Sequence, residues 1–360
     1  MDPAAHWTDW MGGAARAGYL SARAPTDTPA VAWATAAGSG LRSAPVLTDQ
    51  VVLVASTDRT LRAFDRQSGT EFWGQRLGGT PGAPLLLGDR IYVGTEDGNE
   101  GEVRALRFRD GRTQWRRKVG PVPAPLAAAG DTLFGITSRG AAFALRTRDG
   151  REVWKTSLRV RGLVWGLVPG PDRVFAVSIG DTLFALDRGS GRLVGRAPLP
   201  GRVVGPPALA AGTLVVATAQ GAAAAYAVSS DAPTLLWETA GFDPFVGGPV
   251  IVGDRALAVT EHGELVAFGL ADGRHRVLAR LEDAASAAPT AVENGVLVGT
   301  LTGRLYLLDL EGRLLWTKQL EGSITHPVAV TDFGIVVPMY GPVEGFLGSR
   351  PLRGKVVLLR

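Results

Sequence analysis

Eight copies of a unit of about 40 residues follow one another along this chain, and they restrict its possible folds more than any other feature. Seven copies are marked by a proline and the remaining one by Trp165; the prolines are Pro45, Pro84, Pro125, Pro207, Pro249, Pro289 and Pro327. The successive spacings are 39, 41, 40, 42, 42, 40 and 38 residues. A period of this length predicts a solenoid or a propeller.

Each unit contains four short apolar runs separated by turn residues, as the segment 84–119 illustrates. The runs are too short for helices, show no 3.6-residue periodicity and are rich in Val, Leu, Phe and Tyr, so each predicts a strand. A unit is therefore a four-stranded antiparallel meander. Asp65 and Gly69 fit the turn between the third and fourth strands, because Asp can cap a turn and Gly can adopt a positive φ.

A tryptophan recurs four residues after the turn glycine, and we expect it to pack between neighbouring units. A buried tryptophan removes roughly 200 Å² from water, which suits it to join two sheets. The expected docking residues are Trp33, Trp73, Trp115, Trp154, Trp237 and Trp316. Gly195 and Val277 occupy the same place in two units, where we expect weaker seams.

The two ends of the chain predict that the repeats close into a ring. The eighth unit stops one strand short at residues 355–360, whereas residues 30–38, with Trp33, look like a fourth strand without partners. Pairing these segments removes an unpaired sheet edge. We therefore predict an all-β, eight-bladed propeller of four-stranded antiparallel blades over residues 30–360, closed by an N-terminal strand that completes the last blade and preceded by a lead-in segment, 1–29.

The repeat resembles that of the pyrroloquinoline-quinone (PQQ) type propellers, as the frame of Ala63, Asp65, Gly69 and Trp73 indicates. The lead-in is also similar to theirs through Trp7, Gly12, Arg16 and Gly18. This family includes quinone-dependent dehydrogenases, sensor modules and BamB, the non-catalytic outer-membrane protein assembly factor. The resemblance thus implies the fold, while function depends on the site.

The sequence favours a non-catalytic scaffold that binds another protein, as BamB does, over an enzyme. The quinoprotein dehydrogenases hold PQQ with a pair of cysteines, and this chain has no cysteine. Phosphate-loop, zinc-protease and serine-hydrolase motifs are absent from the sequence. We expect no cofactor; the alternative is a PQQ- or small-ligand-binding sensor module or a degenerate quinoprotein dehydrogenase.

Ligands and partners of propellers usually use the face formed by the loops from strand four to strand one and from strand two to strand three. The channel or ligand candidates on this face are Arg42, Arg161, Trp165, Arg202, Phe245, His262 and His326. In the alternative function, Trp165 would stack on PQQ, and Arg42, Arg161 or Arg202 would bind its carboxylates; packing is the favoured role of Trp165.

A long loop predicted at 338–354 in the last unit is the main candidate for partner binding. Loops of this length in a compact domain are often functional. It combines aromatic and charged side chains suited to a protein interface; they are Tyr340, Glu344, Phe346, Arg350 and Arg353.

The acidic segment 95–103 offers Asp97, Asn99 and Glu102 as weak candidates for a Ca²⁺ site. Its spacing does not match an EF-hand, and an acidic hairpin tip is usually solvated, so we expect no bound metal.

The net charge of +4 and the pI of 9.7 do not indicate nucleic-acid binding, because 34 acidic residues are interspersed with 38 basic ones. The longest basic run is the "RRK" of residues 116–118. No stretch is apolar enough to span a membrane, and we expect a monomer. The acidic start lacks a leader pattern, which predicts a cytoplasmic protein if the chain is complete and a periplasmic or cell-envelope protein if a leader was removed.

Overall fold

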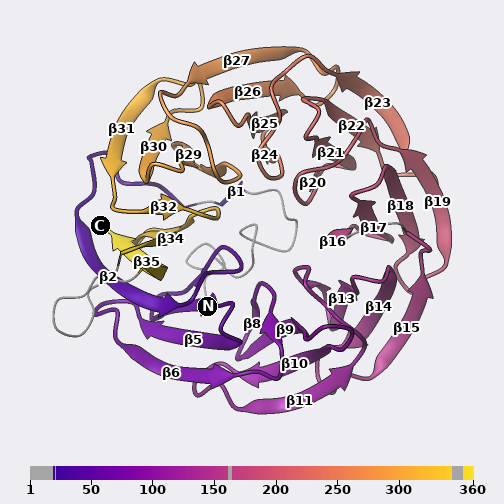
Figure 1. Ribbon diagram of the computed structural model, residues 1–360. Coiled ribbons are helices and arrows are strands. Elements are labelled where there is room, and N and C mark those ends of the chain that lie inside the picture. The colour runs from indigo at the N-terminus through magenta and orange to yellow at the C-terminus, as the bar shows by residue number, and fades with distance from the viewer. Residues whose placement is uncertain (1–18, 21, 161–163, 343–351) are drawn as a thin grey trace.

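The computed structural model describes residues 19–20, 22–160, 164–342 and 352–360. All regular secondary structure in these residues is β-strand, arranged as eight sheets around a common central axis (Figure 1). Each sheet is a blade of four antiparallel strands, so the predicted eight-bladed propeller is confirmed.

The blades follow one another in chain order, with the first strand of each nearest the central axis (Figure 1). From inner to outer strand, blades 1 to 4 consist of β3 (Val46–Leu47), β4 (Val51–Ala55), β5 (Thr60–Asp65) and β6 (Glu71–Arg76); β8 (Leu85–Leu87), β9 (Arg90–Glu96), β10 (Glu102–Arg107) and β11 (Thr113–Lys118); β12 (Ala127–Ala129), β13 (Thr132–Ile136), β14 (Ala141–Arg146) and β15 (Glu152–Ser157); and β16 (Val164–Pro169), β17 (Arg173–Ser178), β18 (Thr182–Asp187) and β19 (Leu193–Pro198).

Blades 5 to 8 consist of β20 (Ala208–Ala210), β21 (Thr213–Ala217), β22 (Ala223–Ala227) and β23 (Thr234–Thr239); β24 (Val250–Val252), β25 (Arg255–Val259), β26 (Glu264–Gly269) and β27 (His275–Arg280); β28 (Thr290–Val292), β29 (Gly295–Gly299), β30 (Arg304–Leu308) and β31 (Leu314–Gln319); and β33 (Ala329–Thr331), β34 (Gly334–Pro342), β35 (Leu352–Leu359) and β2 (Val31–Gly38). Three short strands are added to these sheets: β1 (Tyr19–Leu20), β7 (Thr80–Pro81) and β32 (Ser323–Ile324).

The core lies between the blades, because their second and third strands are covered on both faces. All five residues of β4 are buried, and so are large side chains such as Phe64, Tyr92 and Tyr226. The fourth strands form the outer wall and are mostly exposed, as in β11. This gradient explains the continuous apolar runs at the middle of each repeat and the polar composition at its end.

The turn between the third and fourth strands has the chemistry that the sequence predicts. The Asp65 carboxylate accepts hydrogen bonds from the backbone N–H and the hydroxyl of Ser68, both at 2.7 Å, and Gly69 has a φ of +70°. Gly69 also lies against Trp33, since a Cβ at this glycine would come within 2.7 Å of the indole ring. The glycine is therefore required both by the turn and by the seam between two blades.

The six repeated tryptophans lie at seams between blades. In blade 3, the indole N–H of Trp154 donates to the Arg188 carbonyl of blade 4 at 2.9 Å, and the ring covers Gly191. The other five donate in the same way, from Trp33 to Arg66, Trp73 to Phe108, Trp115 to Thr147, Trp237 to Leu270 and Trp316 to Pro25.

The two seams that lack the repeated outer-strand tryptophan are bridged by ion pairs, which the repeat pattern does not predict. Between blades 4 and 5, Gly195 allows the backbones to approach closely, and Arg173 pairs with Asp231 across the seam. Between blades 6 and 7, Glu311 accepts from two arginines of blade 6, Arg255 at 3.1 Å and Arg276 at 2.9 Å.

The ring closes where the two ends of the chain meet in blade 8. Strand β2 pairs antiparallel with β35, with Val31 opposite Leu359, and Ala30 and Arg360 exchange two backbone hydrogen bonds. The lead-in segment makes a second contact with the ring, because β1 pairs parallel with β28 of blade 7. The Pro25 carbonyl then accepts the Trp316 indole N–H at 2.8 Å, in the place where other blades use a turn carbonyl.

Candidate functional site

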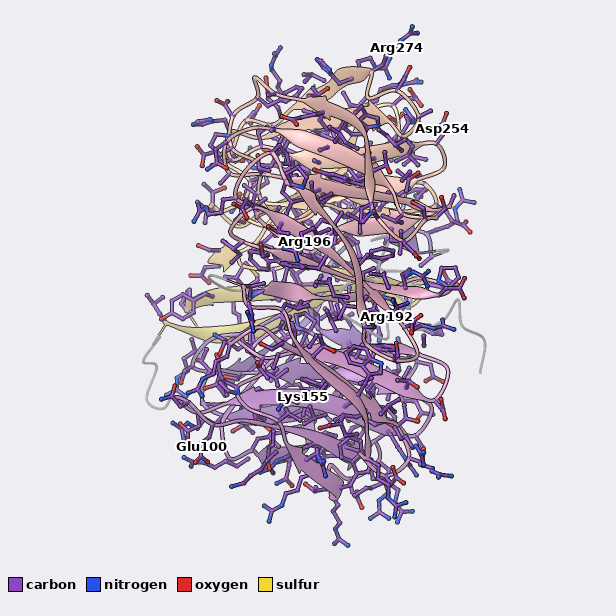
Figure 2. All side chains as sticks on the ribbon, turned by 90° about the vertical axis from the view of Figure 1, so that its right-hand side faces the viewer. Glu100, Lys155, Arg192, Arg196, Asp254 and Arg274 are labelled. Atoms are coloured by element: carbon purple, nitrogen blue, oxygen red, sulfur yellow. The ribbon has the colours of Figure 1, made fainter. Side chains whose placement is uncertain are left out.

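The loops from strand four to strand one and from strand two to strand three lie on one face of the ring, which we call the loop face. Short bridges join the two sets of loops, for example Leu41 to Ser56 and Val203 to Thr218. In Figure 2 this face is on the left, where Glu100 is labelled, and the opposite turns of Asp254 and Arg274 are on the right.

Both ends of the predicted loop 338–354 belong to β-strands, so that prediction was wrong in its boundaries. Residues 338–342 of β34 pair with residues 352–356 of β35, and only 343–351 lie outside the described residues. The sequence did not reveal this because Pro338, Gly341 and Pro342 resemble turn residues. The hairpin extends the last blade beyond the loop face (Figure 2, yellow strands).

Exposed apolar side chains lie on and beside this hairpin. Tyr340 is 43% exposed and Leu352 is 61% exposed, and the strand register places them on the same face of the hairpin. Leu301, 58% exposed, lies in the loop after β29 of blade 7, where the Thr300 carbonyl accepts a hydrogen bond from the Ile324 N–H of β32. We call Tyr340 and Leu352 the hairpin patch.

Of the residues predicted to bind a partner, Tyr340 and Arg353 lie in the described part of the chain. Arg353 is exposed on β35. The other predicted partner-binding residues, Glu344, Phe346 and Arg350, lie outside the described residues.

Two channel candidates, Arg42 and His326, lie close enough to interact electrostatically. Arg42 is half-buried and forms an ion pair with Glu96 of blade 2 at 2.6 Å. Burial, assisted by the charge of Arg42, lowers the pKa of His326 to about 4, and the ring contacts the Thr325 hydroxyl at 3.0 Å. His326 is therefore neutral at physiological pH.

The remaining channel candidates do not converge with these two. Trp165 donates its indole N–H to the Val203 carbonyl of blade 5 at 2.8 Å and packs into that seam. Arg202 is exposed. His262 is also exposed and pairs with Asp243. Arg161 lies outside the described residues.

Phe245 is not a channel residue, and its prediction as a ligand candidate was wrong. It is only 3% exposed and packs against Phe242 and Phe268, with ring centroids 5.6 and 6.1 Å away. Its loop turns the side chain into the core between blades 5 and 6, which a spacing argument could not distinguish from the channel wall.

The weak Ca²⁺ candidates are not arranged as a metal site. Asp97 binds both guanidinium nitrogens of Arg59, at 2.9 and 3.3 Å, and Glu102 binds Arg104 at 2.6 Å. Asn99 is exposed at the hairpin tip. Across the described ranges, no three His, Cys, Asp or Glu side chains are close enough to hold a metal ion together. Arginines neutralise these carboxylates instead.

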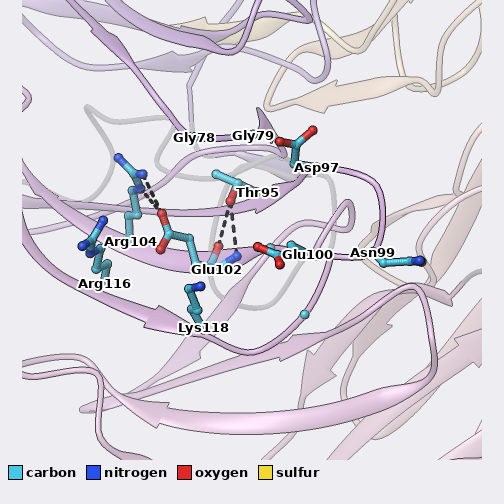
Figure 3. A pocket seen from close by; sticks show the side chains of 12 residues that line it. Gly78, Gly79, Thr95, Asp97, Asn99, Glu100, Glu102, Arg104, Arg116 and Lys118 are labelled. Carbon is cyan, nitrogen blue, oxygen red and sulfur yellow. Dashed lines mark hydrogen bonds and ion pairs between the residues drawn. The ribbon is translucent and has the colours of Figure 1, made fainter.

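A pocket of about 430 Å³ lies where the loop face meets the outer wall of blade 2 (Figure 3). Arg104 and Arg116 lie on one side of it, and Asn99 lies on the other. Four glycines contribute backbone to its walls; they are Gly78, Gly79, Gly101 and Gly120. The spacing of the repeats does not predict this pocket; its only signals in the sequence are the acidic segment 95–103 and the basic run 116–118.

A second, larger pocket of about 1120 Å³ lies on the opposite face of the ring, across the turns of blades 3, 4 and 5. Its lining includes Pro169, Pro171, Leu209 and Val228, together with Arg173. Nothing in the repeat pattern distinguishes these turns from those of the other blades, so the sequence does not predict this pocket either.

Comparison with known proteins identifies relatives of the whole ring. A model of the family described as "Outer membrane protein assembly factor BamB" matches residues 16–162, 138–241 and 226–357. The BamB of Yersinia pestis is 25% identical over 259 residues, which cover 66% of this chain and 64% of the relative. The BamB of Shewanella oneidensis is 25% identical over 362 residues, which cover 91% and 80%. The match thus spans slightly less than two thirds of the Yersinia protein.

Solved structures of very different sequence share the fold. BamB of Moraxella catarrhalis superposes with a TM-score of 0.72 at 18% identity, covering 93% of this chain and 98% of that one. The quinohemoprotein alcohol dehydrogenase of Comamonas testosteroni gives 0.75 at 12% identity, covering 99% and 80%. No helix in the described part of the chain is long and apolar enough to cross a bilayer. The matching family model shows that the chain belongs to the BamB family.

Proposed function

We propose that this member of the BamB family is a non-catalytic scaffold that binds another protein through its loop face in the cell envelope. The observation that carries the proposal is the β34–β35 hairpin, which holds the hairpin patch out from a ring that is otherwise regular. Large apolar side chains exposed together on a monomer surface are typical of a protein interface. The names of the relatives support a role for this contact in outer membrane protein assembly.

The hairpin also has a backbone that can receive a partner strand. Strand β32 covers β34 only opposite Met339 and Tyr340, and β2 covers β35 only as far as Gly354. Beyond these points, Gly341, Pro342 and Arg353 pair only within the hairpin in the described structure. A partner could add a strand here while its apolar side chains contact the hairpin patch.

The second candidate function is binding of PQQ or another small anionic ligand at the channel mouth. Arg42 favours it, because a half-buried guanidinium near the neutral His326 could bind a carboxylate. Glu96 opposes it by already occupying Arg42. We therefore rank the scaffold first and expect neither a resident cofactor nor catalysis.

The experiment compares association with envelope membranes of the chain's own organism for the unmodified protein, the double variant Tyr340→Ala/Leu352→Ala and the control Phe72→Ala. Phe72 is 57% exposed on β6, away from the hairpin. We expect the double variant to bind about tenfold less and the control to bind normally. Photo-crosslinking from position 340 then identifies the protein contacted.

Equal binding by all three proteins would refute the hairpin as the interface. Quenching of tryptophan fluorescence by PQQ at micromolar concentration, lost in Arg42→Gln, would instead support the second function.

A further inference from the structure

We propose that the pocket on blade 2 binds an extended acidic segment of another protein, which adds as a fifth strand to the free edge of β11. This site is separate from the hairpin patch on blade 8. The inference depends on the charges of the pocket, on their ion pairs and on the exposed strand edge.

The register of β10 and β11 places four charged side chains in a two-by-two array on one face of the blade. Glu102 lies opposite Lys118, and Arg104 lies opposite Arg116. Because residues two apart on a strand share a face, all four side chains point to the same side. All four line the pocket, whereas the intervening Arg117 does not and instead pairs with Glu152.

The array has more positive charge than its own carboxylates neutralise. Glu102 is committed to Arg104 at 2.6 Å, with both side chains mostly buried. Among the described residues, no carboxylate lies within ion-pair distance of Arg116 or Lys118, and both side chains are exposed. Two arginines directly opposite each other on adjacent strands repel, so this arrangement costs stability until an anion is bound.

The acidic residues at the other end of the pocket do not cancel this excess. Asp97 is held by Arg59 outside the array. Glu100 also lines the pocket and lies between Asn99 and Lys118 in Figure 3, but one further carboxylate leaves the three cations of the array in excess. A carboxylate that enters beside β11 would therefore meet Arg116 and Lys118 first.

The strand edge favours a peptide over a free phosphate or a nucleic acid. Strand β11 is the outermost strand of its blade, so its outward backbone groups are unpaired in the described structure. A strand added to this edge would place every second side chain on the same face as the array, beside Arg116 and Lys118. The glycine walls leave room for those side chains, because Gly78 and Gly79 carry none.

Positive charge on an outer strand can also serve to prevent aggregation through the strand edge. The outer strand of blade 1 separates this role from anion binding, because it carries a positive charge without the array. Arg76 of β6 occupies the register position of Lys118, since it lies opposite Thr60 as Lys118 lies opposite Glu102. Arg76 is exposed but has no arginine pair beside it, because the register places Gly74 opposite Arg62. It therefore serves as the matched control.

The test measures binding of a fluorescent eight-residue peptide of alternating acidic and β-branched residues, Glu-Val-Glu-Thr-Glu-Val-Glu-Thr, to the full chain by anisotropy. We expect binding that weakens about tenfold in Arg116→Gln/Lys118→Gln and by less than about twofold in Arg76→Gln. Replacing Glu by Gln in the peptide, or methylating its alternate backbone nitrogens, should abolish binding. Unchanged circular dichroism of the variants verifies folding.

Several results would overturn the proposal. They are equal weakening by the blade 1 and blade 2 variants, full binding of the methylated peptide, and tighter binding of inorganic phosphate, oligonucleotide or phosphatidylglycerol vesicles than of the acidic peptide. The Tyr340→Ala/Leu352→Ala variant should bind the peptide normally, so failure of the scaffold proposal and failure of this one are distinguishable.

Discussion

Replacing Trp154 by alanine should destabilise the ring at the seam between blades 3 and 4. The side chain is 6% exposed, so it removes about 200 Å² from water, worth about 5 kcal/mol at about 25 cal/mol per Å². Its indole hydrogen bond to the Arg188 carbonyl adds about 1 kcal/mol. Alanine retains part of the contact and the site relaxes, so we expect a loss of about 3–5 kcal/mol.

The assay is urea unfolding followed by far-ultraviolet circular dichroism, combined with hydrogen exchange. The midpoint should fall in Trp154→Ala, and amide exchange should increase first in β15 and β18, on the two sides of the seam. Trp154→Phe, which retains an aromatic ring but has no N–H donor, should lower the free energy of unfolding less than Trp154→Ala does. Phe72→Ala, a truncation of an exposed aromatic, should change the free energy of unfolding by less than about 0.5 kcal/mol.

The reasoning would be refuted by a loss below about 1 kcal/mol in Trp154→Ala, or by a loss equal to that of Phe72→Ala. An increase of exchange spread evenly around the ring would contradict the local role of the seam.

Three further predictions concern the seams and the channel mouth. Glu311→Gln should lower the urea midpoint of unfolding at low salt and hardly at all in 1 M NaCl, because salt screens its two partly exposed arginine pairs; an equal fall of the midpoint at both salt concentrations would contradict this. Burial in the folded state lowers the pKa of His326 from 6.5 to about 4, so the unfolded chain binds this proton more readily and the free energy of unfolding should fall as the pH drops from about 6.5 to about 4. His326→Gln should make the free energy of unfolding less dependent on pH in this range. An NMR titration of the folded protein that gives a His326 pKa above 6 would refute this prediction. Gly69→Ala should lower the free energy of unfolding more than Gly88→Ala does, because both glycines have positive φ but only Gly69 lies against Trp33. Equal unfolding midpoints of the two variants would contradict a role for this contact.

The sequence by itself determined the ring, because each blade is specified by local signals that occur eight times. Apolar runs of strand length, the Asp65–Gly69 turn and Trp73 depend on neighbours within one unit or the next. The missing strand of the last unit and the unpaired segment at Trp33 predicted their own pairing, since an unpaired edge is costly. Repetition thus made the fold predictable from spacing alone.

Only the tertiary structure decided which residues meet across blades. The spacing of the repeats predicted Phe245 on the loop face, but its side chain turns into the core. The sequence also offered Asp97 and Glu102 as possible metal ligands, whereas in the structure they form ion pairs with Arg59 and Arg104. The array of Arg104 and Arg116 depends on the register of two strands, and the ion pairs of Glu311 depend on how two blades stack. Side-chain direction and partners are set by packing between segments distant in sequence, and a repeat specifies only the segments.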